Sequence, residues 1–90
     1  MIHEAEEFEV SDVARFKEAF EGFRATIEQA GGSDVRLLRH TEAPNRVLGT
    51  IRWPDVEACH TFAREHEAEF GSALGPLIVS AGPSQLWEEL

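Results

Sequence analysis

Hydrophobic residues spaced three and four apart predict one long helix near the start of the chain. This spacing places them on a single helix face, with the charged residues mostly elsewhere. Ser11 and Asp12 are suited to cap the start of the helix. Gly31 and Gly32 are suited to end it, because glycine tolerates the left-handed conformation at a helix C-terminus. The apolar face of this single predicted helix consists of Val13, Phe16, Phe20, Phe23, Ile27 and Ala30.

A second amphipathic helix is predicted to begin at Pro54. Proline is favoured in the first turn of a helix, and the carboxylate of Asp55 suits the positive end of the helix dipole. Gly71 is expected to interrupt the helix, and residues 72–80 are expected to form a loop with a short helical turn. The apolar face of this helix contains Val56, Cys59, Phe62, Ala63, His66 and Phe70.

The remaining apolar segments are predicted to be strands. Residues 2–10 alternate weakly between polar and apolar positions, and their acidic start is expected to face solvent. Residues 35–41 and 46–53 flank a segment with the composition of a turn, so they are predicted to be neighbouring strands. Residues 85–90 provide the last strand, after a break at Gly82–Pro83.

The resulting order, β-α-β-β-α-β, is typical of an α+β, ferredoxin-like fold. We predict a single domain over residues 1–90, in which two helices cover one face of a four-stranded antiparallel sheet. The opposite face is then left bare. Because a chain of 90 residues buries only a limited core, we expect a homodimer in which a second copy covers this face.

The charge of the chain excludes some classes of partner. Its formal net charge is −9, with 17 acidic and 8 basic residues. Nucleic acids and anionic membranes require clustered lysine and arginine, so neither is an expected partner. Cys59 is the single cysteine, which excludes an intrachain disulfide and a CxxC pair. The acidic N-terminal segment is unlike a secretion signal, and we expect a cytoplasmic protein.

His66 is the leading candidate for a catalytic side chain. It lies between Phe62 and Phe70 on the predicted apolar face, where loss of water contact favours the neutral imidazole and allows it to act as a base. The alternative is a structural histidine bonded to a backbone carbonyl. The position of His40 depends on strand register. One register places it on the helix-covered face with Val47, Ile51 and Trp53, and a shift of one residue places it on the bare face.

Three further residues are candidates for a ligand site. Trp53 lies where a strand meets a helix, so it either lines a pocket or fills the core. Gly49 leaves a patch of the sheet without a side chain, where a helix or a ligand can approach closely. Cys59 is expected to be a small core residue. Nucleotide-binding, serine-hydrolase and zinc motifs are absent, and no metal or flavin site is predicted.

Several segments together resemble the dimeric α+β barrel superfamily, and within it the small antibiotic-biosynthesis-monooxygenase-like domains. The similarity covers nearly the whole chain and concerns helix starts, a turn and core positions. The residues that carry it are Val10–Asp12 with Phe16 and Phe20, Pro44–Asn45 with Val47, and Trp53–Ala58 with Phe62.

This resemblance implies a homodimer with facing sheets and a pocket in each subunit between sheet and helices. The superfamily includes cofactor-independent oxygenases of polyketide-like aromatic compounds, haem-degrading enzymes and proteins of unknown activity. No haem residue is carried over, because the first strand has no asparagine and Phe62 stands where those enzymes have tryptophan. The chain also has no tyrosine to assist oxidation of a phenol.

Two functions are therefore expected from the sequence. The first is a pocket protein similar to the cofactor-independent monooxygenases, which binds an apolar or aromatic metabolite. In that case His66 is the acid or base, and Trp53, His40, Phe62 and Gly49 contact the ligand. The second is a non-catalytic ligand-binding or interaction domain on the same scaffold. An enclosed pocket favours the first function, and a filled core favours the second.

Overall fold

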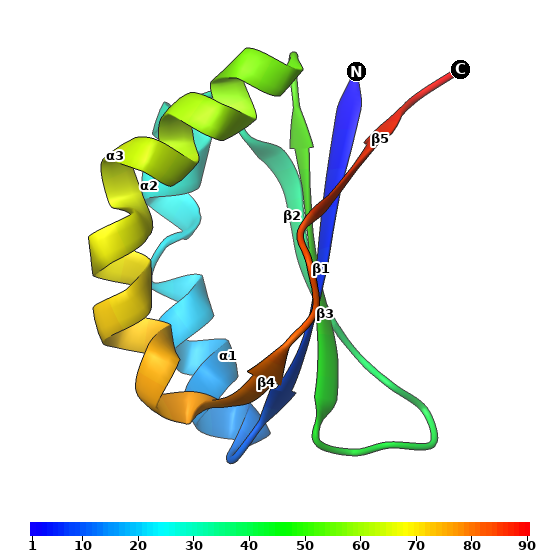
Figure 1. Cartoon of the computed structure of the whole chain (residues 1–90), viewed down its shortest axis with the longest axis vertical. Coiled ribbons are helices and arrows are strands. Elements are labelled where there is room, and N and C mark those ends of the chain that lie inside the picture. The colour runs from blue at the N-terminus through cyan, green and yellow to red at the C-terminus, as the bar shows by residue number, and fades with distance from the viewer.

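The computed structural model describes residues 1–90 as an antiparallel sheet covered on one face by helices (Figure 1). The α+β, ferredoxin-like fold predicted from the sequence is confirmed. In chain order, the elements are β1 (Ile2–Val10), α1 (Val13–Glu21), α2 (Arg24–Gln29), β2 (Ser33–Arg39), β3 (Arg46–Trp53), α3 (Val56–Leu74), the 3₁₀ turn η1 (Gly75–Leu77), β4 (Ile78–Ala81) and β5 (Gln85–Glu88).

The first strand lies at the centre of the sheet. The strand order is β2-β3-β1-β4, and β5 also pairs with β1. The two short strands share one edge of β1, because β4 pairs with Phe8–Val10 and β5 pairs with Ile2–Ala5. The strand expected over residues 85–90 is present as β5, and β4 is an additional strand, so the sheet has five strands instead of the four predicted. The prediction of a loop over residues 72–80 is wrong in its last part, since β4 begins at Ile78.

The helix predicted between Asp12 and Gly31 is in fact two helices. The carboxylate of Asp12 caps α1 by accepting a bond from the backbone N–H of Arg15 at 3.0 Å. At Gly22 the chain leaves the regular helix, and the N–H of Phe23 donates to the carbonyl of Phe20, 3.0 Å away. This tighter hydrogen bond ends α1, and α2 begins two residues after Gly22, at Arg24. Glycine is a poor helix former, which explains the position of the break.

The prediction that Gly71 interrupts the second helix is wrong. α3 continues to Leu74 and ends where Gly75 and Pro76 begin η1. A single glycine costs a helix only about 1 kcal/mol relative to alanine. Packing of Phe70 and Leu74 against the core on either side of Gly71 outweighs this cost.

The core lies between the helices and one face of the sheet. Ten hydrophobic side chains are buried there, and no polar side chain is. They are Val10, Phe16, Phe20, Ile27, Val35, Val47, Trp53, Cys59, Phe62 and Leu74. The burial of Cys59 agrees with its predicted role as a core residue.

The opposite face of the sheet is uncovered in the single chain. The strand register places Leu38, Leu48 and Glu7 side by side on this face. Leu38 is 50% exposed, and Trp87 of β5 is 59% exposed. None of the helices combines the length and apolar character needed to cross a membrane.

A matched pair of glycine substitutions tests the packing of the helices on the sheet. A Cβ at Gly32 lies 2.4 Å from Cγ2 of the buried Ile27, whereas a Cβ at Gly71 has no atom within 4 Å. Gly32→Ala is therefore expected to lower the free energy of unfolding by about 1–3 kcal/mol through overpacking. Gly71→Ala is expected to raise it by up to about 1 kcal/mol through helix propensity. Urea unfolding of both variants measures the difference. Equal stabilities contradict the packing described for Gly32.

Candidate functional site

A pocket of about 560 Å³ lies between the covered face of the sheet and α3. Sixteen residues line it, and nine of them are hydrophobic. β1 and β3 provide one wall, which includes Phe8 and Ile51. α3 provides the opposite wall, which includes Phe62 and Phe70. This is the position that the sequence resemblance implied for a ligand pocket.

Gly49 leaves space for the pocket at the sheet. It pairs with Glu6 across the β1–β3 ladder and lines the cavity. A Cβ at this position lies 3.5 Å from the ring of Phe20 and 3.9 Å from the ring of Phe8. The bare patch of sheet therefore meets a helix side chain on one side and the pocket on the other. The close approach of a helix is thus observed, and contact of Gly49 with a ligand stays a prediction.

Aromatic rings fix the wall that α3 provides. The ring centroids of Phe62 and Trp53 are 5.3 Å apart, and those of Phe62 and Phe70 are 5.5 Å apart in an edge-to-face arrangement. On its other side Phe70 stacks on Phe23 at 4.1 Å. Such pairs are favourable beyond the area that they bury. They anchor the middle of α3 above the pocket.

Trp53 supports the pocket without lining it. Its side chain is fully buried. Its indole N–H donates to one carboxylate oxygen of Glu4 at 2.9 Å, and the hydroxyl of Ser84 donates to the other oxygen at 3.0 Å. Glu4 itself lines the pocket. The core interpretation of Trp53 is thus the one observed, and its contact with the pocket passes through Glu4 and Phe62.

Glu6 is the half-buried carboxyl group of the pocket that has no hydrogen-bond partner. It lines the cavity from β1, two residues after Glu4 on the same face of the strand. No side chain or backbone group donates a hydrogen bond to its carboxylate. Burial raises the pKa of Glu6, and the nearby charge of Glu4 raises it further. The expectation that the acidic start of the first strand faces solvent is wrong for these two residues. Their alternation with Phe8 and Val10 places them on the covered face.

Cys59 lines the same pocket but is not a nucleophile. Burial, followed by the charge of Glu4, raises the pKa of this thiol to about 12. The thiol therefore stays protonated at neutral pH, and the thiolate that nucleophilic chemistry requires does not form.

Arg64 and Glu67 add two charged groups from α3. The guanidinium of Arg64 donates to the hydroxyl of Thr61 at 3.2 Å. Neither residue was predicted to belong to the site, because both lie off the apolar face of the predicted helix, which contains Cys59, Phe62 and His66. The sequence does contain one sign of a pocket at this position. Ala63 and Gly71 are small residues on the pocket side of α3, and they leave room beside the helix.

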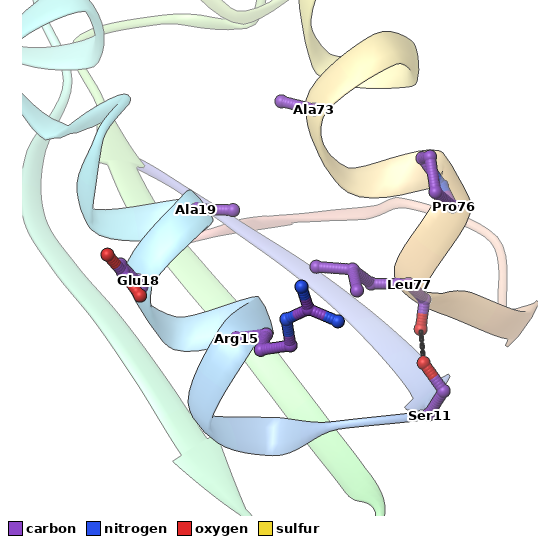
Figure 2. Close-up of a pocket in the computed structure, with 7 residues that line it drawn as sticks. All are labelled: Ser11, Arg15, Glu18, Ala19, Ala73, Pro76 and Leu77. Carbon is purple, nitrogen blue, oxygen red and sulfur yellow. Dashed lines mark hydrogen bonds between the residues drawn. The ribbon is translucent and has the colours of Figure 1, made fainter.

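A second depression lies on the surface between α1 and η1 (Figure 2). Its volume is about 580 Å³, but only seven residues line it and it is widely open to solvent. Ser11 joins its two sides by donating a hydrogen bond to the carbonyl of Leu77 at 3.4 Å. Its side chains do not surround a ligand, so the pocket beneath α3 is the stronger candidate site.

His66 lies outside the lining of the pocket. Its ring packs against the ring of Phe62 at 4.7 Å, and its Nδ1 atom is 3.4 Å from a carboxylate oxygen of Glu69. The side chain of His66 is 22% exposed. A catalytic role for His66 stays a prediction, since His66 is not among the residues that line the cavity.

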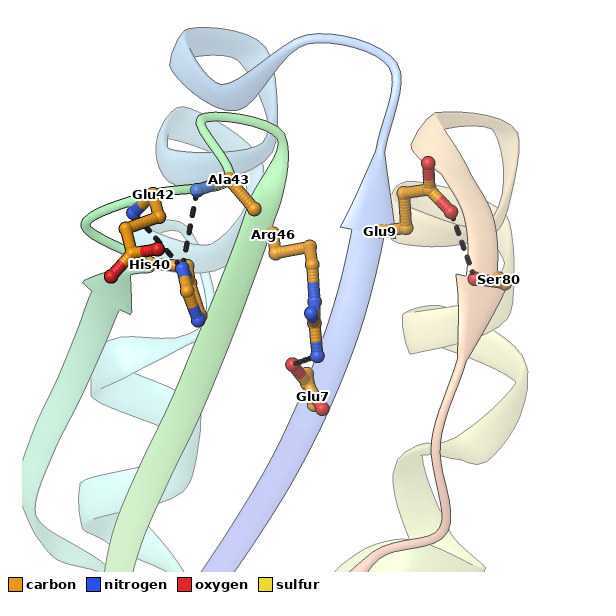
Figure 3. A network of polar contacts seen from close by, with 7 residues as sticks. All are labelled: Glu7, Glu9, His40, Glu42, Ala43, Arg46 and Ser80. Atoms are coloured by element: carbon orange, nitrogen blue, oxygen red, sulfur yellow. Dashed lines mark hydrogen bonds and ion pairs between the residues drawn. The ribbon is translucent and has the colours of Figure 1, made fainter.

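His40 lies on the uncovered face of the sheet, away from the pocket (Figure 3). Arg39 pairs with Val47, so His40 shares a face with Arg46 and Leu48. The register that would place it with Val47 and Trp53 is not the one observed. Its Nδ1 atom accepts hydrogen bonds from the backbone N–H groups of Glu42 and Ala43, at 3.0 and 3.1 Å. These bonds hold the turn between β2 and β3.

The structure therefore brings Phe62 and Gly49 together in the pocket, with Trp53 directly behind its wall. It leaves His66 and His40 outside. No group of three or more histidine, cysteine, aspartate or glutamate side chains is arranged to hold a metal ion. The chemistry available to a ligand in the pocket is that of carboxyl groups, one guanidinium and aromatic rings.

Comparison with known proteins identifies the fold. No protein-family model matches the sequence. No curated protein is significantly similar to it in sequence either. A provisionally assigned antibiotic biosynthesis monooxygenase from Bordetella bronchiseptica superposes with a TM-score of 0.87 at 21% identity, over 99% of this chain and 96% of that one.

Two other solved structures are similar over comparable lengths. SnoaB, a cofactor-independent oxygenase from Streptomyces nogalater, matches with a TM-score of 0.83 at 21% identity, covering 99% of this chain and 92% of SnoaB. A second provisionally assigned monooxygenase, from Caulobacter crescentus, matches with a TM-score of 0.83 at 16% identity, over 99% and 89% of the two chains. The chain therefore has the fold of the antibiotic-biosynthesis-monooxygenase-like proteins, as its sequence pattern indicated.

Proposed function

We propose that this chain binds an apolar or aromatic metabolite in the pocket beneath α3, and that it acts as a cofactor-independent monooxygenase. The observation that supports this most is the pocket itself, which combines hydrophobic walls with a half-buried carboxyl group, that of Glu6, that has no hydrogen-bond partner. Ligand pockets are typically apolar with a few polar groups that fix orientation. The fold that the chain shares with SnoaB, a cofactor-independent oxygenase, supports the same reaction class.

An oxygenase without a cofactor requires a substrate that supplies its own electrons. When a base removes a proton from an activated CH₂ group, the carbanion that remains can reduce O₂. One oxygen atom then becomes a carbonyl group and the other leaves as water, so that CH₂ and O₂ give C=O and H₂O. The protein contributes the base, the orientation of the substrate and the exclusion of water.

Glu6 is the group that we assign to proton removal. Its raised pKa makes it a stronger base than an exposed carboxylate, and it is not engaged by another side chain. Cys59 is protonated at neutral pH. His66 is the alternative base, although it lies outside the lining of the cavity and packs on the ring of Phe62.

We also propose that the chain functions as a homodimer through its uncovered sheet face. Leu38, Leu48 and Trp87 expose apolar surface on this face, beside the ion pair of Glu7 and Arg46 (Figure 3). A second copy would bury this surface and give the two sheets a common interior.

A non-catalytic binding domain on the same scaffold is the second candidate function. It is favoured by the absence of any histidine or tyrosine among the lining residues. The two functions differ in one measurement. An oxygenase converts an activated CH₂ compound such as anthrone to the corresponding quinone, anthraquinone, and consumes O₂. A binding protein binds the compound and leaves it unchanged.

Occupation of the pocket is testable with two matched substitutions on α3. Ala63 and Ala68 are both exposed, and of the two only Ala63 lines the pocket. Ala63→Trp is expected to weaken binding of 1-naphthylmethanol, a fluorescent neutral probe, by about tenfold or more, because the indole fills the cavity. Ala68→Trp is expected to leave binding unchanged within about twofold. Equal affinities of the two variants for the probe contradict this pocket as the binding site.

The environment of Glu6 is testable through stability. A raised pKa means that the folded chain holds the proton more tightly than the unfolded chain. The corresponding stability is present at low pH and is lost as the pH rises from the ordinary value of 4.5 through the raised pKa. Glu6→Gln, which mimics the neutral carboxyl, is therefore expected to raise the melting temperature near pH 7, with a smaller gain at about pH 3.5.

Glu21→Gln is the control with the opposite sign. A hydrogen bond from Arg24 lowers the pKa of Glu21, so this substitution removes a favourable contact near neutral pH. Its effect is expected to be small because the pair is exposed. Thermal unfolding followed by circular dichroism measures both variants. A melting temperature that is unchanged or lower for Glu6→Gln near neutral pH argues against a raised Glu6 pKa.

The homodimer is testable by light scattering after size exclusion. Leu38→Asp places a carboxylate on the uncovered face and is expected to convert a dimer into monomers at micromolar concentration. Val56→Asp is the control, because Val56 is exposed in the first turn of α3, where a carboxylate is tolerated. A monomeric parent chain, or a Leu38→Asp variant that stays dimeric, contradicts the proposed interface.

A further inference from the structure

We infer that the pocket beneath α3 selects ligands that carry an ammonium group on an apolar body, that it disfavours the corresponding carboxylates, and that Glu6 binds the ammonium. This inference rests on the proposed function, because it names the class of ligand for the same pocket; with an ammonium held at Glu6, the role of base passes to His66, the alternative named above. Its basis is the arrangement of charged groups around the cavity.

The charged groups of the pocket are unbalanced. Of the sixteen lining residues, three have carboxyl groups and one has a guanidinium. Glu4 and Glu6 extend from β1, and Glu67 and Arg64 from α3. The remaining walls are mainly hydrophobic, so charges within the cavity are less screened than they are in bulk water. A bound anion meets net repulsion there, and a bound cation meets net attraction.

The two carboxyl groups of β1 differ in their capacity to bind a cation. Both oxygens of Glu4 already accept hydrogen bonds, from the indole of Trp53 at 2.9 Å and from the hydroxyl of Ser84 at 3.0 Å. Glu6 has no such partner. Its carboxyl is half-buried, and it lines the cavity beside Gly49, its partner on β3. An ammonium at this point gains a charge-assisted hydrogen bond from Glu6 and the field of Glu4.

Arg64 is the group that favours the opposite ligand class. It lies on the exposed side of α3, and its guanidinium is bonded to Thr61 at 3.2 Å, in the preceding turn of the helix. A carboxylate ligand that pairs with Arg64 in this pocket is also repelled by the carboxylates that line it, Glu6 and Glu67 among them. The single cation therefore does not offset the carboxylates of the pocket.

A series of three probes that share one aromatic body tests this inference. The probes are 1-naphthylmethylamine, which is an ammonium at neutral pH, 1-naphthylmethanol, which is neutral, and 1-naphthaleneacetate, the anion of 1-naphthaleneacetic acid. Titration calorimetry gives the dissociation constant of each near pH 7.5. The amine is expected to bind at least about tenfold more tightly than the acetate. Glu6→Gln is expected to reduce this ratio by about fivefold or more.

The control is Glu65→Gln, which removes the same formal charge from an exposed position of α3 that does not line the pocket. It is expected to leave the ratio within about twofold of the parent value. If the control and Glu6→Gln reduce the ratio equally, the net charge of the chain explains the preference and the role of Glu6 is overturned.

The remaining outcomes separate this inference from the proposed function. If the acetate binds as tightly as the amine or more tightly, the charge preference is overturned, while the pocket is still shown to bind aromatic ligands. If none of the three probes binds the folded parent chain, the pocket does not admit an aromatic body. In that case the inference and the proposed function both fail.

Discussion

The structure depends on one layer of buried contact between the helices and the covered face of β1 and β3. Trp53 lies at one end of this layer, where β3 ends and α3 is about to begin. Its ring packs on Phe62 of α3, and its indole N–H is bonded to Glu4 of β1. One side chain thereby links the central strand, the adjacent strand and the long helix. The height of α3 above the sheet, and with it the space beneath the helix, follows from this contact.

The order of helices and strands could be predicted because the apolar positions keep a regular period over long segments. Three local features could not. The break at Gly22 and Phe23 does not interrupt the spacing of apolar residues, so a single helix was the natural interpretation. Gly71 was given too much weight, since the packing of Phe70 and Leu74 on the core carries α3 past it. β4 is only four residues long, and it forms because the edge of β1 is available for pairing.

The candidate site was predictable only in part. Gly49 and Phe62 could be found because a missing side chain in a strand and an aromatic ring on a helix face are visible in the sequence. Glu4 and Glu6 were within reach, since they alternate with Phe8 and Val10, but an acidic strand start is more often exposed. His40 could not be placed, because its face depends on the register set by the turn from Glu42 to Asn45. The position of His66 depends on the rotation of α3, which the aromatic contacts of Phe62 fix.

The break between β4 and β5 has a mechanical consequence. Between them, residues 82–84 are held to the backbone of β1 by one hydrogen bond, from the N–H of Gly82 to the carbonyl of Glu7 at 2.8 Å. The hydroxyl of Ser84 adds one bond to Glu4. Because strand pairing with β1 continues on both sides, local opening of this edge is confined to these three residues, and the rest of the sheet keeps its hydrogen bonds.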